Sequence, residues 1–155
     1  TQVSSLYLHV PFCQHLCNYC DFYKRKLENH ASQFEEFHQF LISSLHKQTD
    51  LFQKHHFTWT DLDTVYLGGG TPSLWGPMGA KFLKEHLPTS LATNCEFTME
   101  IDPGTWTEEM LSAWKEIGLN RISIGTQTLN SNFLKIMDRI HSLDDSIQFL
   151  ERLHK

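Results

Sequence analysis

The sequence lacks long apolar runs and concentrated basic residues, and it has only four cysteines in 155 residues. No apolar run approaches the about 18 residues of a membrane-spanning helix, and the first residues do not form a charged-then-apolar leader. Lysine and arginine total 13 against 18 acidic residues, a net charge of −5 that argues against a nucleic-acid partner. Three of the cysteines crowd together, which excludes a spread-out disulfide framework and favours a reducing, cytoplasmic compartment.

Strand-like and helix-like segments alternate along the chain. The apolar patterns predict strands over residues 6–10, 62–67, 96–101 and 121–125. Helices are expected from a Ser32–Glu35 capping box, over 77–87, from a Thr105–Glu108 capping box, from Ser131 and from about Ser142. Strands that alternate with helices indicate an α/β fold with a parallel sheet.

Two architectures fit four βα units: a (β/α) barrel of the TIM type and an open, doubly wound sheet. Counting units does not separate them. Four units cannot close a barrel, and the chain ends at Lys155 inside an apolar-periodic segment. We therefore expect residues 1–155 to be the N-terminal part of a longer domain, or a partner to cover the exposed edge strand.

The unusual residues all follow the ends of predicted strands. A cysteine cluster follows the first strand, a GGGTP segment at 68–72 follows the second, Glu100 and Asp102 close the third, and Gln127 follows the fourth. Parallel α/β folds bind ligands at the carboxyl ends of their strands. These four segments therefore point to one shared site.

The cluster has the spacing Cys-x3-Cys-x2-Cys and comprises Cys13, Cys17 and Cys20. A [4Fe-4S] cluster usually takes four thiolates, so three thiolates leave one iron free to bind another molecule. The competing interpretations are a zinc site completed by His9 or His15 and three unrelated thiols. Cys95 lies outside this spacing and is expected to be an ordinary core or surface thiol.

Together, the motifs LYLHVPFCQHLCNYCDF, LGGGTPSL, MEIDP and RISIGTQTLNSNFLKIMDRIHS resemble the radical S-adenosylmethionine (SAM) superfamily, and within it the oxygen-independent coproporphyrinogen oxidase subgroup. The resemblance implies a partial (β/α) barrel, with about two further units beyond Lys155. It also implies a [4Fe-4S] cluster on the three cysteines, SAM on the fourth iron, and an external electron donor such as a flavodoxin. In this superfamily the reduced cluster cleaves SAM to methionine and a 5′-deoxyadenosyl radical.

The resemblance also assigns SAM contacts at matching positions. On a strand, Tyr7 and His9 share the face opposite Leu6 and Leu8, which would turn Tyr7 into the barrel lumen. A carboxylate that ends an apolar strand is costly unless it is paired, which favours a functional role for Glu100. His141 belongs to the last motif but has no assigned role. The expected SAM contacts are Tyr7, Tyr19, Gly69, Gly70, Thr71, Glu100, Gln127 and Arg139.

One position separates two branches of this subgroup. Coproporphyrinogen dehydrogenases carry a further cysteine two residues after the third cluster cysteine, where this chain has Phe22. The Cys-Asp-Phe ending resembles the heme chaperone (HemW-type) branch, which implies binding of heme and its transfer to an acceptor protein. The alternative is the dehydrogenase itself, which decarboxylates coproporphyrinogen III to protoporphyrinogen IX. Whether the chain is an enzyme stays open at this point.

Overall fold

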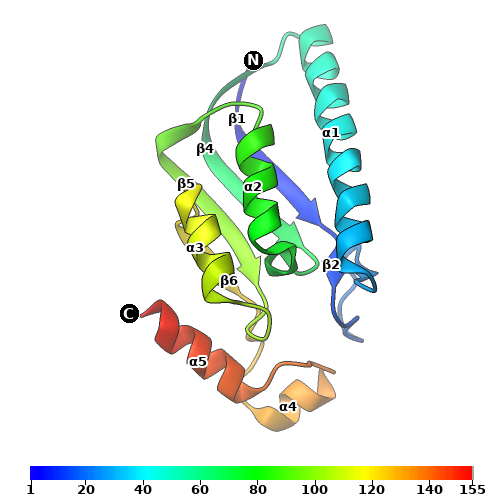
Figure 1. The fold of residues 1–155 in the computed structure, drawn as a ribbon, viewed down its shortest axis with the longest axis vertical. Helices are drawn as coiled ribbons and strands as arrows, with labels where there is room; N and C mark the ends of the chain where they lie inside the picture. Colours follow the sequence, from blue (N-terminus) through cyan, green and yellow to red (C-terminus); the bar gives the residue numbers. More distant parts are fainter. Residues whose placement is uncertain (155) are drawn as a thin grey trace.

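The computed structural model describes residues 1–154 as a curved parallel sheet with helices packed against it (Figure 1). The sheet has four parallel strands in the order β1-β4-β5-β6, and a separate short pair is formed by β2 and β3. The strands are β1 (Gln2–Val10), β2 (Phe12–Cys13), β3 (Arg25–Lys26), β4 (Thr58–Gly69), β5 (Leu91–Ile101) and β6 (Arg121–Ile124). All four predicted strands are therefore present, and three of them begin earlier than predicted.

Every predicted helix is present, although the first three in chain order begin at a different residue from the one predicted. The helices are α1 (His30–Lys54), α2 (Gly76–His86), α3 (Glu108–Glu116), α4 (Ser131–Ile136) and α5 (Leu143–Leu153), with a short 3-10 turn, η1 (Pro72–Trp75), before α2. Ser142 caps α5 and forms a full capping box with Asp145, which confirms the predicted start of the last helix.

The two predicted capping boxes, Ser32–Glu35 and Thr105–Glu108, are wrong. Asn29 caps α1 and accepts a hydrogen bond from the Ser32 backbone N–H at 3.2 Å, so Ser32 lies inside the first turn. Thr107 caps α3 by accepting from the Met110 N–H at 3.1 Å. Asn and Thr both offer the side-chain oxygen that a helix N-terminus needs, so the cap can move by a few residues without changing the helix.

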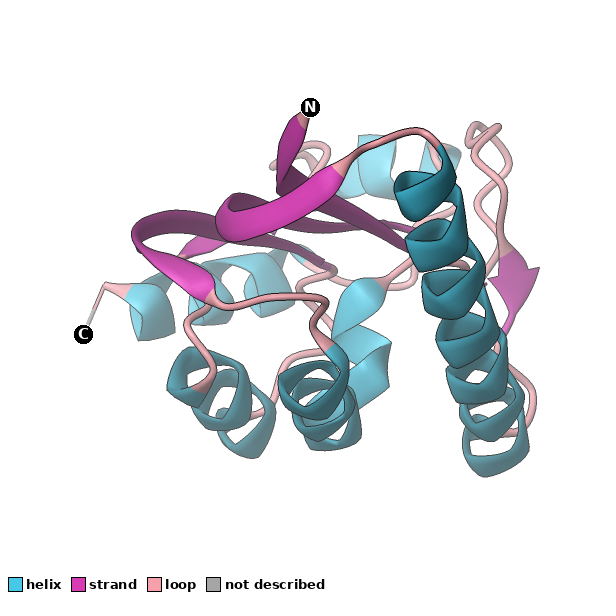
Figure 2. Cartoon of the chain, turned by 90° about the horizontal axis from the view of Figure 1, so that it is seen from above, coloured by secondary structure: helices cyan, strands magenta, loops and turns pink. Residues whose placement is uncertain are grey.

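The strand order selects the barrel-type architecture over the doubly wound one. Each new strand of the main sheet is added beside the previous one in chain order, without a reversal. Right-handed crossovers that always advance in one direction place their helices on one face of the sheet. Helices α1, α2 and α3 indeed cover the same face, as seen along and across the strands (Figures 1 and 2). The residues described here thus form part of a (β/α) barrel.

The two faces of the sheet differ in chemistry. The helix-covered face is apolar, and five of its side chains on β4 and β5 are at most 1% exposed. They are Val65, Leu67, Phe97, Met99 and Ile101. The opposite face carries polar and aromatic side chains, because successive strand residues point to opposite sides. One row in register across this face consists of Tyr7, Tyr66, Thr98 and Arg121.

A buried histidine joins α1 to the core below the sheet. His38 is 9% exposed, stacks on Phe82 with ring centroids 4.2 Å apart, and accepts a hydrogen bond from Trp75 Nε1 at 2.9 Å. Accepting through Nε2 requires the neutral ring. Burial lowers the pKa of His38 below its ordinary value.

We expect this histidine to make stability depend on pH. Because the folded-state pKa is lowered, the unfolded chain binds the proton more readily, and stability falls as pH drops below about 6.5 toward the folded-state pKa. Above about 6.5 the contribution of the neutral pair is complete. His38→Gln keeps an acceptor for Trp75 without titrating, so its urea midpoint should fall less than wild type between pH 7.5 and 5.5. Equal falls in both proteins would contradict this.

Candidate functional site

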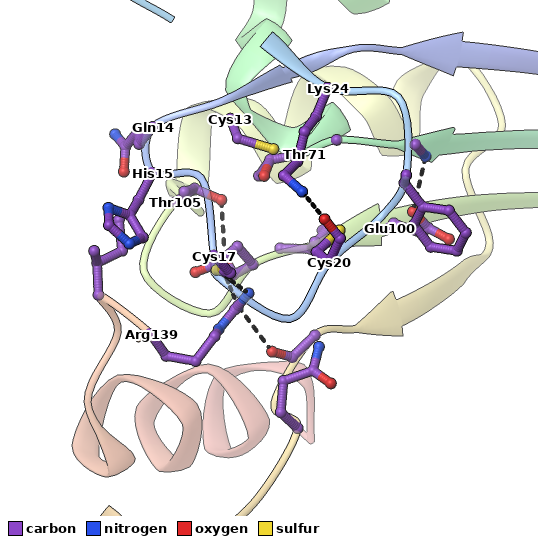
Figure 3. Close-up of a pocket in the computed structure, with 18 of the residues that line it drawn as sticks. Cys13, Gln14, His15, Cys17, Cys20, Lys24, Thr71, Glu100, Thr105 and Arg139 are labelled. Carbon is purple, nitrogen blue, oxygen red and sulfur yellow. Dashed lines mark hydrogen bonds and ion pairs between the residues drawn. The ribbon is translucent and has the colours of Figure 1, made fainter. Parts of the chain in front are cut away.

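A pocket of about 330 Å³ lies at the carboxyl ends of the main-sheet strands. Its walls come from the loop after β2, the ends of β4 and β5, the segment after β6, and Arg139 (Figure 3). The predicted site residues that line it are Cys13, Cys17, Tyr19, Cys20, Gly69, Gly70, Thr71, Glu100, Gln127 and Arg139. Segments separated by more than 100 residues in the sequence therefore meet in one cavity.

The three clustered cysteines lie on a loop that β2 and β3 hold at its base. Cys13 ends β2 and is 8% exposed, whereas Cys17 and Cys20 are half-buried, and all three are free thiols. The Leu27 N–H donates to the Cys13 carbonyl at 2.8 Å, and Lys24 Nζ donates to the Cys20 carbonyl. These bonds close the loop so that all three cysteines line the pocket.

The environment of Cys13 differs from that of an isolated thiol. Burial raises the pKa of Cys13, and the neighbouring Cys20 and Cys17 act in the same direction. A hydrogen bond from the Thr71 side chain and the charge of Lys24 act in the opposite direction. A bound cation would stabilise the Cys13 thiolate against burial and against its neighbouring cysteines.

The arrangement does not fit a single zinc ion. Within residues 1–154, no group of three or more His, Cys, Asp or Glu side chains lies close enough to hold one metal ion. The proposed fourth ligands are also engaged elsewhere: His9 contacts Tyr7 and Tyr23 at 3.0 and 2.8 Å, and His15 Nε2 lies 2.7 Å from Asp138. A cluster of several irons spreads its thiolate ligands over different atoms, and three cysteines around one pocket fit that requirement.

Gly69 and Gly70 line the wall of the pocket beside the cysteines, and this pair is called the glycine ledge below. Gly69 has a φ of 113°, in the region that favours glycine. A Cβ on Gly70 would lie 2.6 Å from the carbonyl oxygen of Phe12, so the chain of β4 can approach β2 only without a side chain there. The next residue, Thr71, donates its backbone N–H to that same Phe12 carbonyl at 2.7 Å.

Glu100 is held in place by two donors. Tyr66 donates its hydroxyl to Oε1 at 2.8 Å, and the Gly69 N–H donates to Oε2 at 3.0 Å. Burial raises the pKa of Tyr66, and the bond to Glu100 adds to this effect, so Tyr66 is a neutral donor. Glu100 therefore reaches the pocket as an oriented carboxylate with acceptor capacity left.

Tyr7 lies on the predicted sheet face but does not line the pocket. Its ring stacks on Tyr66 with centroids 6.0 Å apart, and its hydroxyl lies 3.0 Å from His9 Nδ1. The side chain is 59% exposed. The strand parity that predicted its direction is confirmed, because Tyr7, Tyr66 and His9 all lie on the face opposite the helices.

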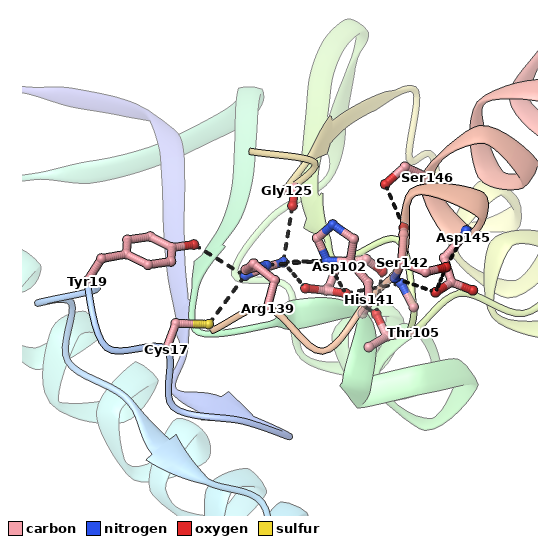
Figure 4. Close-up of polar contacts among 12 residues, drawn as sticks. Cys17, Tyr19, Asp102, Thr105, Gly125, Arg139, His141, Ser142, Asp145 and Ser146 are labelled. Carbon is pink, nitrogen blue, oxygen red and sulfur yellow. Dashed lines mark hydrogen bonds and ion pairs between the residues drawn. The ribbon is translucent and has the colours of Figure 1, made fainter. Parts of the chain in front are cut away.

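Arg139 and Gln127 form the wall opposite the glycine ledge. Gln127 lines the pocket and has a φ of 62°, a left-handed backbone conformation that is uncommon for residues other than glycine. Arg139 forms a buried ion pair with Asp102, and both side chains are 11% exposed. Its guanidinium also reaches Cys17 and Tyr19 on the cysteine loop (Figure 4).

Tyr66 was missing from the predicted site, and Asp102 was placed at the site without a partner or a role. Tyr66 orients Glu100, and the sequence marks it only as an aromatic residue within a strand. Asp102 pairs with Arg139, and it stands in an Asp-Pro-Gly sequence typical of a turn. The signal that finds Asp102 is its place at a strand end beside Glu100, where other site residues also gather.

Comparison with known proteins identifies the class that this fold and site define. Residues 7–155 match the family described as the Radical SAM superfamily. That match covers nearly the whole chain, so the protein belongs to the radical SAM superfamily. The superfamily implies a [4Fe-4S] cluster and SAM, and the pocket offers the three thiols that such a cluster uses.

Individual relatives are more specific. The chain is 35% identical to the "Heme chaperone HemW" of Lactococcus lactis over 164 residues, which cover 98% of this chain and 38% of the relative. It is 36% identical to the HemW of Escherichia coli over 141 residues, which cover 88% of this chain and 35% of the relative. The chain thus spans less than two fifths of the length of these relatives.

A solved structure confirms the fold. The coproporphyrinogen III oxidase (HemN) of Escherichia coli, described as a radical SAM enzyme, superposes with a TM-score of 0.72 at 24% identity. The match covers 95% of this chain and 33% of that protein. The described chain therefore has the fold of part of a radical SAM protein, as the motifs predicted. Within residues 1–154, no helix is long and apolar enough to cross a bilayer.

Proposed function

We propose that this chain forms the cluster- and SAM-binding part of a heme chaperone, which binds heme and transfers it to an acceptor protein. The observation that carries the proposal is Phe22, in the place where coproporphyrinogen dehydrogenases of the same subgroup have a cysteine. Phe22 lines the pocket and is 71% exposed. The similarity to proteins named heme chaperone supports the same assignment.

In this proposal Cys13, Cys17 and Cys20 hold a [4Fe-4S] cluster. When bound and reduced, such a cluster supplies one electron for the cleavage of SAM, and a donor such as a flavodoxin would deliver that electron. The four cysteines described are free thiols, which supports a reducing, cytoplasmic compartment. The oxygen sensitivity of an open iron site is a further reason to handle the protein anaerobically.

SAM would lie in the pocket against Glu100 and the neighbouring glycine segment at residues 69–70, which contact each other directly. The chemistry supports this placement, because an oriented carboxylate suits an ammonium group and bare backbone allows close approach. The residues proposed to contact SAM are Tyr19, Gly69, Gly70, Thr71, Glu100 and Gln127, with Tyr7 next to them on the sheet. Arg139, which the resemblance also assigns to SAM, already finds hydrogen-bond acceptors for its guanidinium within the chain.

The second candidate function is oxidative decarboxylation of coproporphyrinogen III to protoporphyrinogen IX. The structural match to a coproporphyrinogen III oxidase is the reason to test this activity. At 24% identity the match supports a shared fold and not a shared activity. Phe22, in the place of the further cysteine that the dehydrogenases carry two residues after the third cluster cysteine, favours the chaperone.

A heme titration with product analysis tests the choice. We expect the complete, anaerobically reconstituted protein to contain iron and sulfide, to bind heme with a shifted Soret band, and to pass that heme to an apo-acceptor. We expect no protoporphyrinogen when coproporphyrinogen III, SAM and dithionite are supplied. Turnover to protoporphyrinogen would overturn the chaperone assignment in favour of the dehydrogenase, and reconstitution with zinc but no iron would overturn the cluster.

A further inference from the structure

Arg139 has an acceptor for each hydrogen of its guanidinium. Arginine presents five N–H donors. Nε lies 3.3 Å from His141 Nδ1, Nη1 lies 3.6 Å from Cys17 Sγ and 3.4 Å from the Tyr19 hydroxyl, and Nη2 lies 3.1 Å from the Gly125 carbonyl. The fifth acceptor is Asp102, paired with Nη2. The guanidinium is therefore held by contacts within the chain at Nε, Nη1 and Nη2.

The acceptors divide into two groups on opposite sides of the guanidinium (Figure 4). Asp102, Gly125 and His141 accept hydrogen bonds on the side away from the cysteine loop, and we call them the backing group. Cys17 and Tyr19 accept hydrogen bonds on the side of the cysteine loop. The backing group is buried: the side chain of His141 is fully covered, and that of Asp102 is 11% exposed. The guanidinium is thus fixed on one side and directed toward a thiol on the other.

His141 contacts Arg139 through one ring nitrogen. The His141 Nδ1 atom lies 3.1 Å from Nη2 as well as 3.3 Å from Nε, and arginine nitrogens can only donate, so Nδ1 is the acceptor in these two contacts. The same Nδ1 atom lies 3.5 Å from Asp102 Oδ1, so His141 packs against both members of the Arg139–Asp102 pair. The buried His141 Nε2 has no hydrogen-bond partner within residues 1–154, so the imidazole is placed for Arg139 and not for its other nitrogen.

We propose that Arg139 is a hydrogen-bond donor to the Cys17 thiolate of the cluster and raises the cluster's reduction potential, and that Asp102 and His141 are its positioning residues. This inference rests on the cluster assignment of the proposed function. It gives a role to His141 and adds a contact with a cluster ligand to the SAM contact that the resemblance assigns to Arg139.

The direction of the effect follows from charge. Reduction adds one electron to the [4Fe-4S] cluster and its three thiolates, which increases their negative charge. A fixed positive charge and a hydrogen bond to a ligating sulfur stabilise the more negative state. The reduced form then becomes easier to reach, which matters for a cluster that must be reduced before it can act on SAM.

The test is a dithionite-poised redox titration of the complete, reconstituted protein, followed by EPR of the reduced cluster. Arg139→Gln should lower the equilibrium constant for one-electron reduction by on the order of tenfold, which is about 59 mV more negative. Arg152→Gln is the matched control, because Arg152 pairs with Glu108 on the exposed surface and does not line the pocket. Its potential should equal that of wild type.

Two His141 variants test the positioning role. His141→Asn keeps an acceptor near the place of Nδ1 and should retain the wild-type potential, whereas His141→Leu should shift the potential in the same direction as Arg139→Gln, by less. A shift in neither His141 variant would overturn the positioning role.

Iron content separates this inference from the cluster assignment. Wild-type potential in Arg139→Gln at full iron content would overturn the inference and leave the cluster intact. If Arg139→Gln fails to assemble a cluster, the reduction potentials of His141→Asn and His141→Leu test the inference instead, and a wild-type potential in both would overturn it. A wild-type protein that takes up no iron would overturn the cluster assignment itself.

Discussion

Cys17→Ala is expected to abolish cluster assembly. The cluster would lose one of three thiolates, and the fourth cysteine of the chain, Cys95, is 6% exposed in the core behind the sheet and cannot replace it. The Arg139 contact to sulfur would also be lost, which leaves a buried charge with one acceptor fewer. After anaerobic reconstitution, the variant should show iron near background and no absorbance near 400 nm beyond that of apoprotein.

Cys95→Ala is the matched control. It removes a thiol of the same kind from a buried position outside the pocket, so iron content should match wild type while stability falls by about 1 kcal/mol. A brown Cys17→Ala protein at full iron content would contradict the assignment of Cys17 as a ligand. Loss of iron in both variants would point to general destabilisation instead.

Gly70→Ala should damage the site through the backbone. The added Cβ would lie 2.6 Å from the Phe12 carbonyl oxygen and 2.8 Å from the carbonyl carbon of Pro11, and neither atom can rotate away as a side chain does. Relief requires β2 and β4 to separate, which moves Cys13 and Thr71 from their places. We expect a loss of about 1–3 kcal/mol in unfolding free energy, with weakened cluster retention.

Gly104→Ala separates this effect from the general cost of replacing glycine. Its Cβ would meet His141 Cβ at 3.4 Å, an ordinary contact. Urea unfolding and iron retention should therefore stay close to wild type in Gly104→Ala. Equal losses in the two variants would show that the close approach at Gly70 is not the cause.

The sequence predicted the ends of the strands better than their beginnings. The predicted segments 62–67 and 96–101 correspond to β4 and β5, which begin at Thr58 and Leu91. The added residues are mostly polar or exposed, and backbone pairing with neighbouring strands holds them in place. Apolar alternation reports where a strand is buried, so it misses a stretch that only hydrogen bonds define.

The site was predictable to the extent that its residues carry distinctive chemistry. Three cysteines at close spacing, a triple glycine and a carboxylate at a strand end are visible in the sequence, and the structure brings them to one pocket. The roles of Tyr66 and Asp102 were not predicted, because they depend on Glu100 and Arg139, which approach them from other segments. Such partners become evident only when the fold brings the segments together.

Asp138 and Arg139 contact the cysteine loop but are synthesised long after it, so these contacts form late during synthesis of the chain. Asp138 holds His15 and Arg139 holds Cys17, so the cysteine loop is fixed by residues 122 to 123 positions further along the chain. At a synthesis rate of roughly 5–20 residues per second, the cysteines emerge roughly 6–24 s before these partners. During that interval the loop lacks the His15–Asp138 and Cys17–Arg139 contacts. A cluster that assembles after Asp138 and Arg139 have contacted the loop would bind a loop that is already ordered. A cluster that assembles earlier would bear the entropic cost of ordering the loop.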